Sequence, residues 1–168
     1  MTSQCYCTLM TEKDIDPILA IEKMVFPHPW SREFFRLIVA DINNYMLTLR
    51  NDNAIIGYGG YHLLKHRINF LSTRNRYARI VHLINIAITP SEQRRGFGTF
   101  LMNTLMGKAR SNEAEYCYLE VRPNNEKAFS FYRKWGFSVI GIIENYYPIE
   151  GENALVMGTE LFPHLPCE

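Results

Sequence analysis

The chain has 168 residues, of which 47% are hydrophobic, and its formal net charge is +1 at pH 7. This length and hydrophobic content predict a single folded domain over residues 1–168 and exclude a disordered chain. The near-zero charge gives no general attraction to nucleic acid or to a membrane surface. The sequence has no run of 18 apolar residues and no signal-peptide pattern, so we expect a cytoplasmic protein with no membrane partner.

Hydrophobic periodicity predicts an α/β fold with a mixed sheet of about seven strands flanked by about four helices. The predicted strands are residues 5–10, 45–50, 54–64, 80–89, 116–121, 137–144 and 154–161. The predicted helices follow the N-caps Thr11 and Ser31, the loop at 94–99, and Asn124 or Asn125. Residues 145–153 are expected to form a loop between the last two strands.

The segment between the third and fourth predicted strands is strongly basic, and we expect a long loop there. Its basic residues are Lys65, Arg67, Arg74, Arg76 and Arg79. One interpretation is a solvated loop. The other is a surface that guides an acidic substrate, ribosomal RNA or a partner chain. Apart from residues 65–79, the sequence carries no strong nucleic-acid signal.

Cysteine and histidine spacing predicts neither a metal site nor a disulfide framework. The cysteines, which we expect to be reduced, are Cys5, Cys7, Cys117 and Cys167. The histidines show no triad partners in the sequence, and we expect packed or surface positions for all of them. They are His28, His62, His66, His82 and His164.

A strand, a basic glycine-containing loop and a helix follow one another at residues 84–99. The N–H groups at a helix N-terminus are unpaired and carry the positive end of the helix dipole, so they bind phosphate. Gly96 and Gly98 let an anion approach the backbone, and Arg94 and Arg95 add charge. The P-loop string is absent, and Leu101 replaces the third glycine of G-x-G-x-x-G. The pattern predicts an anion site; the alternative is an ordinary helix start with solvated arginines.

The loop, Q-R-R-G-F-G-T, resembles the pyrophosphate loop of the GNAT acetyltransferases, Q/R-x-x-G-x-G/A. Residues 119–137 resemble a second pattern of that family, L-x-V-x-x-x-N-x-x-A-x-x-x-Y-x-x-x-G-F. Asn145-Tyr146-Tyr147-Pro148 and Pro29-Trp30-Ser31 are similar to the RimI-like branch, whose members acetylate the N-terminal alanine of a ribosomal protein. The resemblance covers residues 15–161 and implies the GNAT fold.

The resemblance also implies acetyl-CoA as co-substrate, no metal, and roles for individual residues. The implied cofactor-binding residues are Ile86, Ala87, Ile88, Arg94, Arg95, Gly96, Phe97, Gly98, Thr99 and Asn125. The implied general base is Glu120 and the implied general acid is Tyr132. The implied acceptor-binding residues are Asn85, Tyr146 and Tyr147.

Elementary chemistry supports these two catalytic roles. An α-amine has a pKa near 8, against about 10.4 for lysine, so little free energy is needed to deprotonate it. Glu120 is the one acidic residue in an otherwise apolar strand, where a carboxylate can take that proton. A phenol such as Tyr132 can protonate the leaving thiolate, which is only mildly uphill. The alternatives are a solvent-facing Glu120, a Tyr132 that only packs in the core, and an Asn125 that only caps a helix.

We therefore expect acetyl transfer from acetyl-CoA to a protein or peptide N-terminal α-amine, with a ribosomal protein as the first choice. A second possibility on the same fold is acetylation of a lysine or a small-molecule amine. A third, from another class, is an acyl-CoA-binding module without catalysis.

Overall fold

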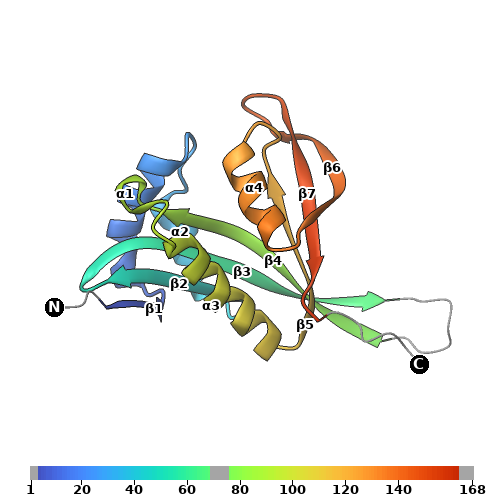
Figure 1. Cartoon of the computed structure of the whole chain (residues 1–168), viewed down its shortest axis with the longest axis horizontal. Coiled ribbons are helices and arrows are strands. Elements are labelled where there is room, and N and C mark those ends of the chain that lie inside the picture. Colours follow the sequence, from blue (N-terminus) through green and yellow to red (C-terminus); the bar gives the residue numbers. More distant parts are fainter. Residues whose placement is uncertain (1–3, 69–75, 163–168) are drawn as a thin grey trace.

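The computed structural model describes residues 4–68 and 76–162, and within them seven strands form one mixed sheet (Figure 1). The strand order is β1-β2-β3-β4-β5-β7-β6, and only β4 and β5 are parallel. The strands are β1 Cys5–Leu9, β2 Asn44–Asn51, β3 Ala54–Ile68, β4 Arg76–Ile88, β5 Ala114–Val121, β6 Ser138–Tyr147 and β7 Glu152–Glu160. The helices are α1 Ile15–Val25, α2 Arg32–Ala40, α3 Phe97–Ser111 and α4 Glu126–Lys134. The predicted α/β fold is confirmed.

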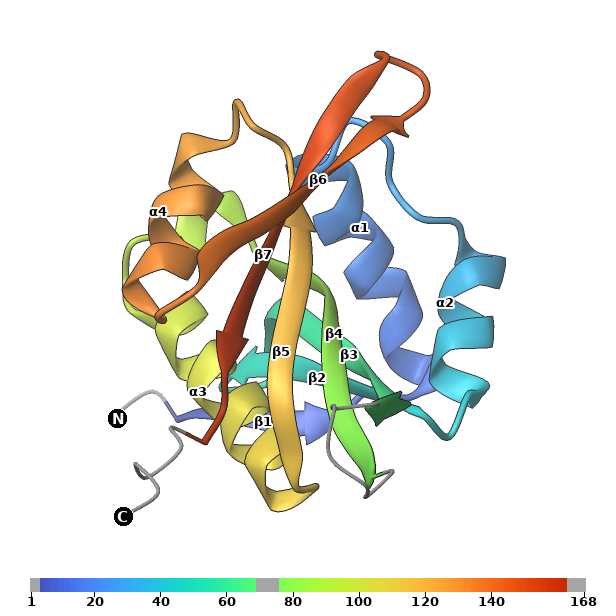
Figure 2. The same cartoon turned by 90° about the vertical axis from the view of Figure 1, so that its right-hand side faces the viewer.

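Helices cover both faces of the sheet, α1 and α2 on one side and α3 and α4 on the other (Figure 2). Each helix buries one stripe of apolar side chains, as the 3.6-residue spacing predicts. The first core contains Ile15, Ile18, Ile21, Phe35, Ile38, Met46 and Tyr58. The second contains Leu101, Met102, Leu105, Met106, Tyr132 and Phe137. None of the helices in the described ranges is long and apolar enough to cross a membrane.

The predicted helix starts are confirmed. The Ser31 hydroxyl accepts a hydrogen bond from the N–H of Phe34 at 3.1 Å and begins α2. The Asn125 side chain accepts from the N–H of Ala128 at 3.2 Å and begins α4, so Asn125 and not its neighbour is the N-cap. Each contact satisfies one of the N–H groups that the first helical turn leaves unpaired.

The two central strands part midway along the sheet. The β4–β5 pairing runs from Arg79 and Ala114 to His82 and Tyr118, and it stops there. Beyond this point β4 stays paired with β3 as far as Ile88, and β5 stays paired with β7 as far as Val121. The two strands visibly diverge in Figure 1. Their facing edges therefore carry backbone N–H and C=O groups that no neighbouring strand uses.

The expectation of a loop over residues 65–79 is wrong at both of its ends. β3 continues to Ile68 and β4 begins at Arg76, and a paired ladder joins them from Lys65–Arg79 to Ile68–Arg76. The residues of this arm are mostly polar and show no apolar alternation, so no strand was predicted there. Residues 69–75, which include Arg74 of the basic segment, lie outside the described residues.

Acidic side chains accompany the described base of this hairpin. Arg79 Nη1 lies 2.7 Å from Glu113 Oε2. Both residues line a pocket of about 550 Å³ together with Lys65, Tyr77 and Glu115. The base of the arm is therefore of mixed charge and not purely basic.

The expected loop at 145–153 is also shorter than predicted. β6 runs to Tyr147 and β7 begins at Glu152, so the strands take in both ends of this segment. Asn145 has a φ of +51°, and the β6–β7 register shifts between Ile143 and Tyr147. A bulge of this kind bends the strand and redirects its side chains, and it leaves no alternating pattern in the sequence.

A close backbone approach at Gly57 on β3 gives a stability prediction. A Cβ at Gly57 would lie 2.7 Å from the carbonyl oxygen of Ala87 on β4. Gly57→Ala should therefore push β3 from β4 and lower the free energy of unfolding by about 1–3 kcal/mol. Denaturant titration measures the change.

The matched control is Gly107→Ala in the exposed face of α3, where an added Cβ meets nothing within 4 Å. This variant should gain up to about 1 kcal/mol from helix propensity. Equal effects of the two substitutions would contradict the packing argument.

Candidate active site

The loop before α3 has the geometry of an anion site. α3 begins at Phe97, and Gly96 occupies its N-cap position with a φ of +87°. Glycine adopts this left-handed conformation without strain and has no side chain with which to cap the helix. The first N–H groups of α3 therefore remain available to an anion. A Cβ at Gly96 would meet nothing within 4 Å, so the approach to these groups is unobstructed.

The two arginines of the loop lie at the surface. Arg95 Nη1 contacts Glu92 Oε2 at 2.5 Å, and its guanidinium lies 5.2 Å from the centre of the Phe97 ring. A surface ion pair of this kind is weak, so a phosphate can take the place of Glu92. Arg94 is exposed and has a φ of +62°, which turns the chain toward the helix.

The loop is fastened to the end of β4 and to α4. The Gln93 side-chain amide donates to the Ile88 carbonyl at 3.0 Å. A Cβ on Gly98 would lie 3.8 Å from side-chain atoms of both Ile88 and Phe131. The structure thus brings the predicted loop residues and the predicted strand segment Ile86–Ile88 together, as expected for one binding surface.

This surface fits acetyl-CoA. The β4 edge beyond His82 carries backbone groups that can pair with the amides of the pantetheine arm, in the manner of an added strand. The α3 N-terminus follows directly and can hold the pyrophosphate. Among the described residues, no group of three or more histidine, cysteine or acidic side chains is placed to hold a metal ion.

Glu120 lies on β5 just beyond the point where the strands part. Its Oε2 atom lies 2.6 Å from Nε2 of His82 on β4, and its side chain is 11% exposed. The alternative of a solvent-facing Glu120 is therefore wrong. The His82 ring stacks on Tyr118 with centroids 4.5 Å apart. The sequence predicted only a packed or surface position for His82, because its contact with Glu120 depends on the pairing of β4 with β5.

Two tyrosines of β6 lie near this carboxylate. Burial, followed by the charge of Glu120, raises the pKa of Tyr146 to about 12. Burial also raises the pKa of Tyr147, although the Arg122 guanidinium, 3.7 Å from the ring centre, opposes this effect. Both phenols therefore stay protonated at neutral pH and can donate hydrogen bonds.

Tyr132 lies on the side of α4 that faces the core and is only 9% exposed. Its ring packs against Phe131 and Phe137. Burial first, then the neighbouring Cys117 and Tyr147, raises the pKa of its hydroxyl well above the ordinary value. Tyr132 thus packs in the core, as one alternative had it, and also retains a proton that it can donate.

Asn85 belongs to a buried network that the sequence did not indicate. Its side-chain amide donates to the Tyr58 hydroxyl at 2.8 Å and to Glu22 Oε1 at 3.3 Å. The Tyr58 hydroxyl also donates to Glu22, which is 1% exposed, and the N–H of Trp30 donates to the other oxygen of Glu22 at 2.8 Å. The network joins α1, β3 and β4 and fixes the Asn85 side chain.

A second cluster links segments that are far apart in the sequence. Arg122 contacts Glu152 at 2.5 Å and Glu150 at 3.2 Å. Glu150 also lies 2.5 Å from His28 Nε2 in the α1–α2 connection. These contacts hold the turn between β6 and β7 against that connection.

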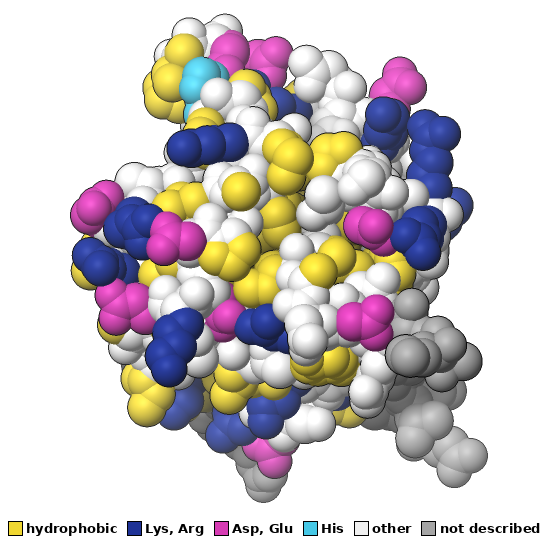
Figure 3. Space-filling view, turned by 90° about the vertical axis from the view of Figure 1, so that its left-hand side faces the viewer, with side chains coloured by type: hydrophobic (Ala, Val, Ile, Leu, Met, Phe, Trp, Pro, Cys, Tyr) yellow, Lys and Arg dark blue, Asp and Glu magenta, His cyan; other side chains and the backbone are white. Residues whose placement is uncertain are grey.

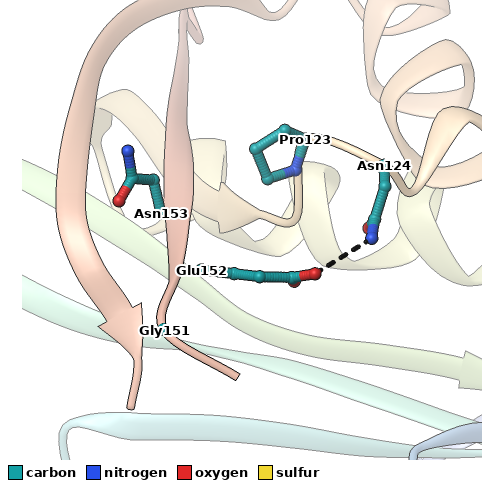
Figure 4. Close-up of a pocket in the computed structure, with 5 residues that line it drawn as sticks. All are labelled: Pro123, Asn124, Gly151, Glu152 and Asn153. Carbon is teal, nitrogen blue, oxygen red and sulfur yellow. Dashed lines mark hydrogen bonds between the residues drawn. The ribbon is translucent and has the colours of Figure 1, made fainter. Parts of the chain in front are cut away.

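A pocket of about 310 Å³ lies beside this cluster (Figure 4). The Asn124 amide donates to Glu152 across it at 3.2 Å. On the face shown in Figure 3, basic and acidic side chains are interspersed around hydrophobic ones. Neither sign of charge dominates that face, in keeping with the small net charge.

The fold, the anion loop and the free strand edge define an acetyltransferase. Residues 15–137 match the Acetyltransferase (GNAT) family, and the chain belongs to that family. It is therefore an N-acetyltransferase, and its acetyl donor is acetyl-CoA.

Several known proteins are similar to this chain. The [ribosomal protein bS18]-alanine N-acetyltransferase of Haemophilus influenzae is 32% identical over 152 residues, which is 88% of this chain and 93% of that protein. An uncharacterised Mycobacterium leprae protein is 33% identical over 153 residues; the match covers 90% of this chain but only 39% of that protein's length.

A solved structure shares the fold. The crystal structure of the ribosomal-protein-S18-alanine N-acetyltransferase from Escherichia coli has a TM-score of 0.79 at 23% identity, and 97% of each chain is covered.

The Glu22 network gives a prediction about pH. Burial raises the pKa of Glu22, although the Trp30 N–H and the Asn85 amide oppose this effect. A raised carboxyl pKa means that the neutral acid stabilises the folded state and that this contribution is lost as pH rises through the folded pKa. Relative to Glu22→Gln, the wild type should therefore lose free energy of unfolding as pH rises from the ordinary carboxyl pKa of about 4.3 toward neutral pH.

Denaturant titrations of the two proteins across this range make the comparison. A difference that is constant, or that grows in favour of the wild type as pH rises, would contradict the assignment.

Proposed function

We propose that this protein transfers the acetyl group of acetyl-CoA to the N-terminal α-amine of a protein, with the N-terminal alanine of a ribosomal protein as the first candidate. The observation that carries the proposal is the largely buried carboxylate of Glu120, which lies just beyond the point where β4 and β5 part, beside the free edge of β4. The names of the Haemophilus influenzae and Escherichia coli relatives support the choice of acceptor.

In this proposal Glu120 is the general base and Tyr132 the general acid. The acceptor arrives as an ammonium, and Glu120 takes one N–H proton, directly or through one water. The amine nitrogen then forms a bond to the thioester carbon, and an N–H of the β4 edge near Ile86 stabilises the oxyanion. The C–S bond breaks and Tyr132 protonates the sulfur. Two protons leave the nitrogen in total; one ends on coenzyme A and one in solvent.

Glu120 and Tyr132 are linked electrostatically through Tyr147. Tyr147 affects the pKa of Tyr132, and Glu120 affects the pKa of Tyr147. Tyr132 keeps its proton at neutral pH, and its raised pKa makes it a weaker acid than an ordinary phenol, so its proton transfer to sulfur is uphill. Tyr146, close to Glu120, offers a hydroxyl to the incoming acceptor.

The contact between His28 and Glu150 favours a chain end as acceptor. It joins the α1–α2 connection to the β6–β7 turn, which follows the proposed acceptor-binding residues Tyr146 and Tyr147. An extended N-terminus can enter beneath such a contact more readily than a lysine in the middle of a chain. The pKa of an α-amine is lower than that of a lysine side chain, so less free energy is needed to deprotonate it, which favours the same acceptor.

The test is thiol release from acetyl-CoA with a panel of acceptors. We expect turnover on peptides with a free N-terminal alanine or serine. N-terminally blocked peptides with one lysine, and small amines, should react at the uncatalysed rate. Turnover on the blocked peptides or small amines would move the function to those acceptors, and no thiol release with any amine would leave only a binding module.

Substitution of the two catalytic candidates gives a sharper prediction. Glu120→Gln should lower kcat by about 10²–10⁴-fold, the usual value of a general base, because glutamine cannot take a proton. Tyr132→Phe should lower kcat while it keeps the core packing of the ring. Both variants should bind acetyl-CoA as the wild type does in calorimetry. An unchanged kcat for either one would remove that residue from the mechanism.

A further inference from the structure

His82 is the side chain in contact with Glu120 to which no role has been given so far. It stands at the last paired position of β4, opposite Tyr118, while Glu120 lies on β5 two residues beyond that pair. Nε2 and Oε2 are 2.6 Å apart, and the His82 side chain is 23% exposed. A carboxylate oxygen can only accept a hydrogen bond, so this ring nitrogen carries the proton.

We propose that His82 is a positioning residue for the reaction, and this inference rests on Glu120 being the base. The Nε2–H group holds Oε2 in place and so fixes the orientation of the carboxylate. A carboxylate that accepts one fixed hydrogen bond loses its rotational freedom before the acceptor arrives. The carboxylate is therefore already oriented before the proton is transferred.

The structure offers substitutions that separate positioning from packing. His82→Phe keeps an aromatic ring to stack on Tyr118 but removes the hydrogen bond to Glu120. His82→Gln keeps an N–H donor but cannot be protonated. The control is His62→Gln on the neighbouring strand, because the His62 ring contacts Asn44 at 2.6 Å and not the base.

We expect His82→Phe to lower kcat by about 10- to 100-fold, which is the effect of one hydrogen bond to a charged group. The KM for acetyl-CoA should not change, because the cofactor surface is intact. His82→Gln, which keeps an N–H donor, should recover most of kcat. His62→Gln should match the wild type in both respects.

A double substitution tests whether His82 acts through Glu120. Glu120→Gln combined with His82→Phe should be no slower than Glu120→Gln alone, because the positioned group is already absent. A double variant slower by the full product of the two effects would overturn the proposal. So would a His82→Phe enzyme with the kcat of the wild type, or a His82→Gln enzyme as slow as His82→Phe.

The same measurements distinguish this inference from the proposed function. If Glu120→Gln turns over at the wild-type rate, the assignment of the base fails and the inference fails with it. If Glu120→Gln is impaired and His82→Phe is not, only the inference fails. If His82→Phe does not fold, His82→Leu, which also lacks the donor, takes its place in the same comparisons.

Discussion

The site depends on one interruption in the sheet, the end of the β4–β5 pairing at His82 and Tyr118. A backbone that leaves hydrogen-bonding groups unpaired loses free energy unless water or a ligand satisfies them. Here the outer neighbours β3 and β7 hold the two strands apart, so the unpaired edges are fixed in position. A cofactor with amide groups along an extended arm can satisfy the β4 edge as a strand would.

The other parts of the site are arranged around this interruption. Residues 94–99 follow the end of β4 and turn the N-terminus of α3 toward it. The proposed base stands on β5 at the beginning of the gap, and the proposed acid stands on α4, which packs against the same loop through Phe131. The network around Glu22 supports β4 from the opposite face of the sheet. Positive charge contributes to the anion site locally, at this loop, and the net charge of the whole molecule contributes little.

The sequence predicted what depends on local chemistry. Caps such as Ser31 and Asn125, apolar periodicity and the glycine loop each leave a signal within a few residues. The contacts of His82 and Glu22 left none, because their partners on the strands lie 36 to 63 residues away along the chain. The hairpin arm and the strand ends at Tyr147 and Glu152 were missed for a related reason. These strand segments form through cross-strand pairing and a bulge, and no hydrophobic alternation in the sequence indicates them.

Amide hydrogen exchange with and without acetyl-CoA tests the central claim most directly, because it reports which backbone groups the cofactor satisfies. The account predicts that saturating acetyl-CoA slows exchange in residues 83–88 at the free edge of β4 and in the loop at 94–99. Exchange in β1 and β2 should not change. Tight acetyl-CoA binding with unchanged exchange in residues 83–88 would contradict the account, because the cofactor would then lie away from the parted strands.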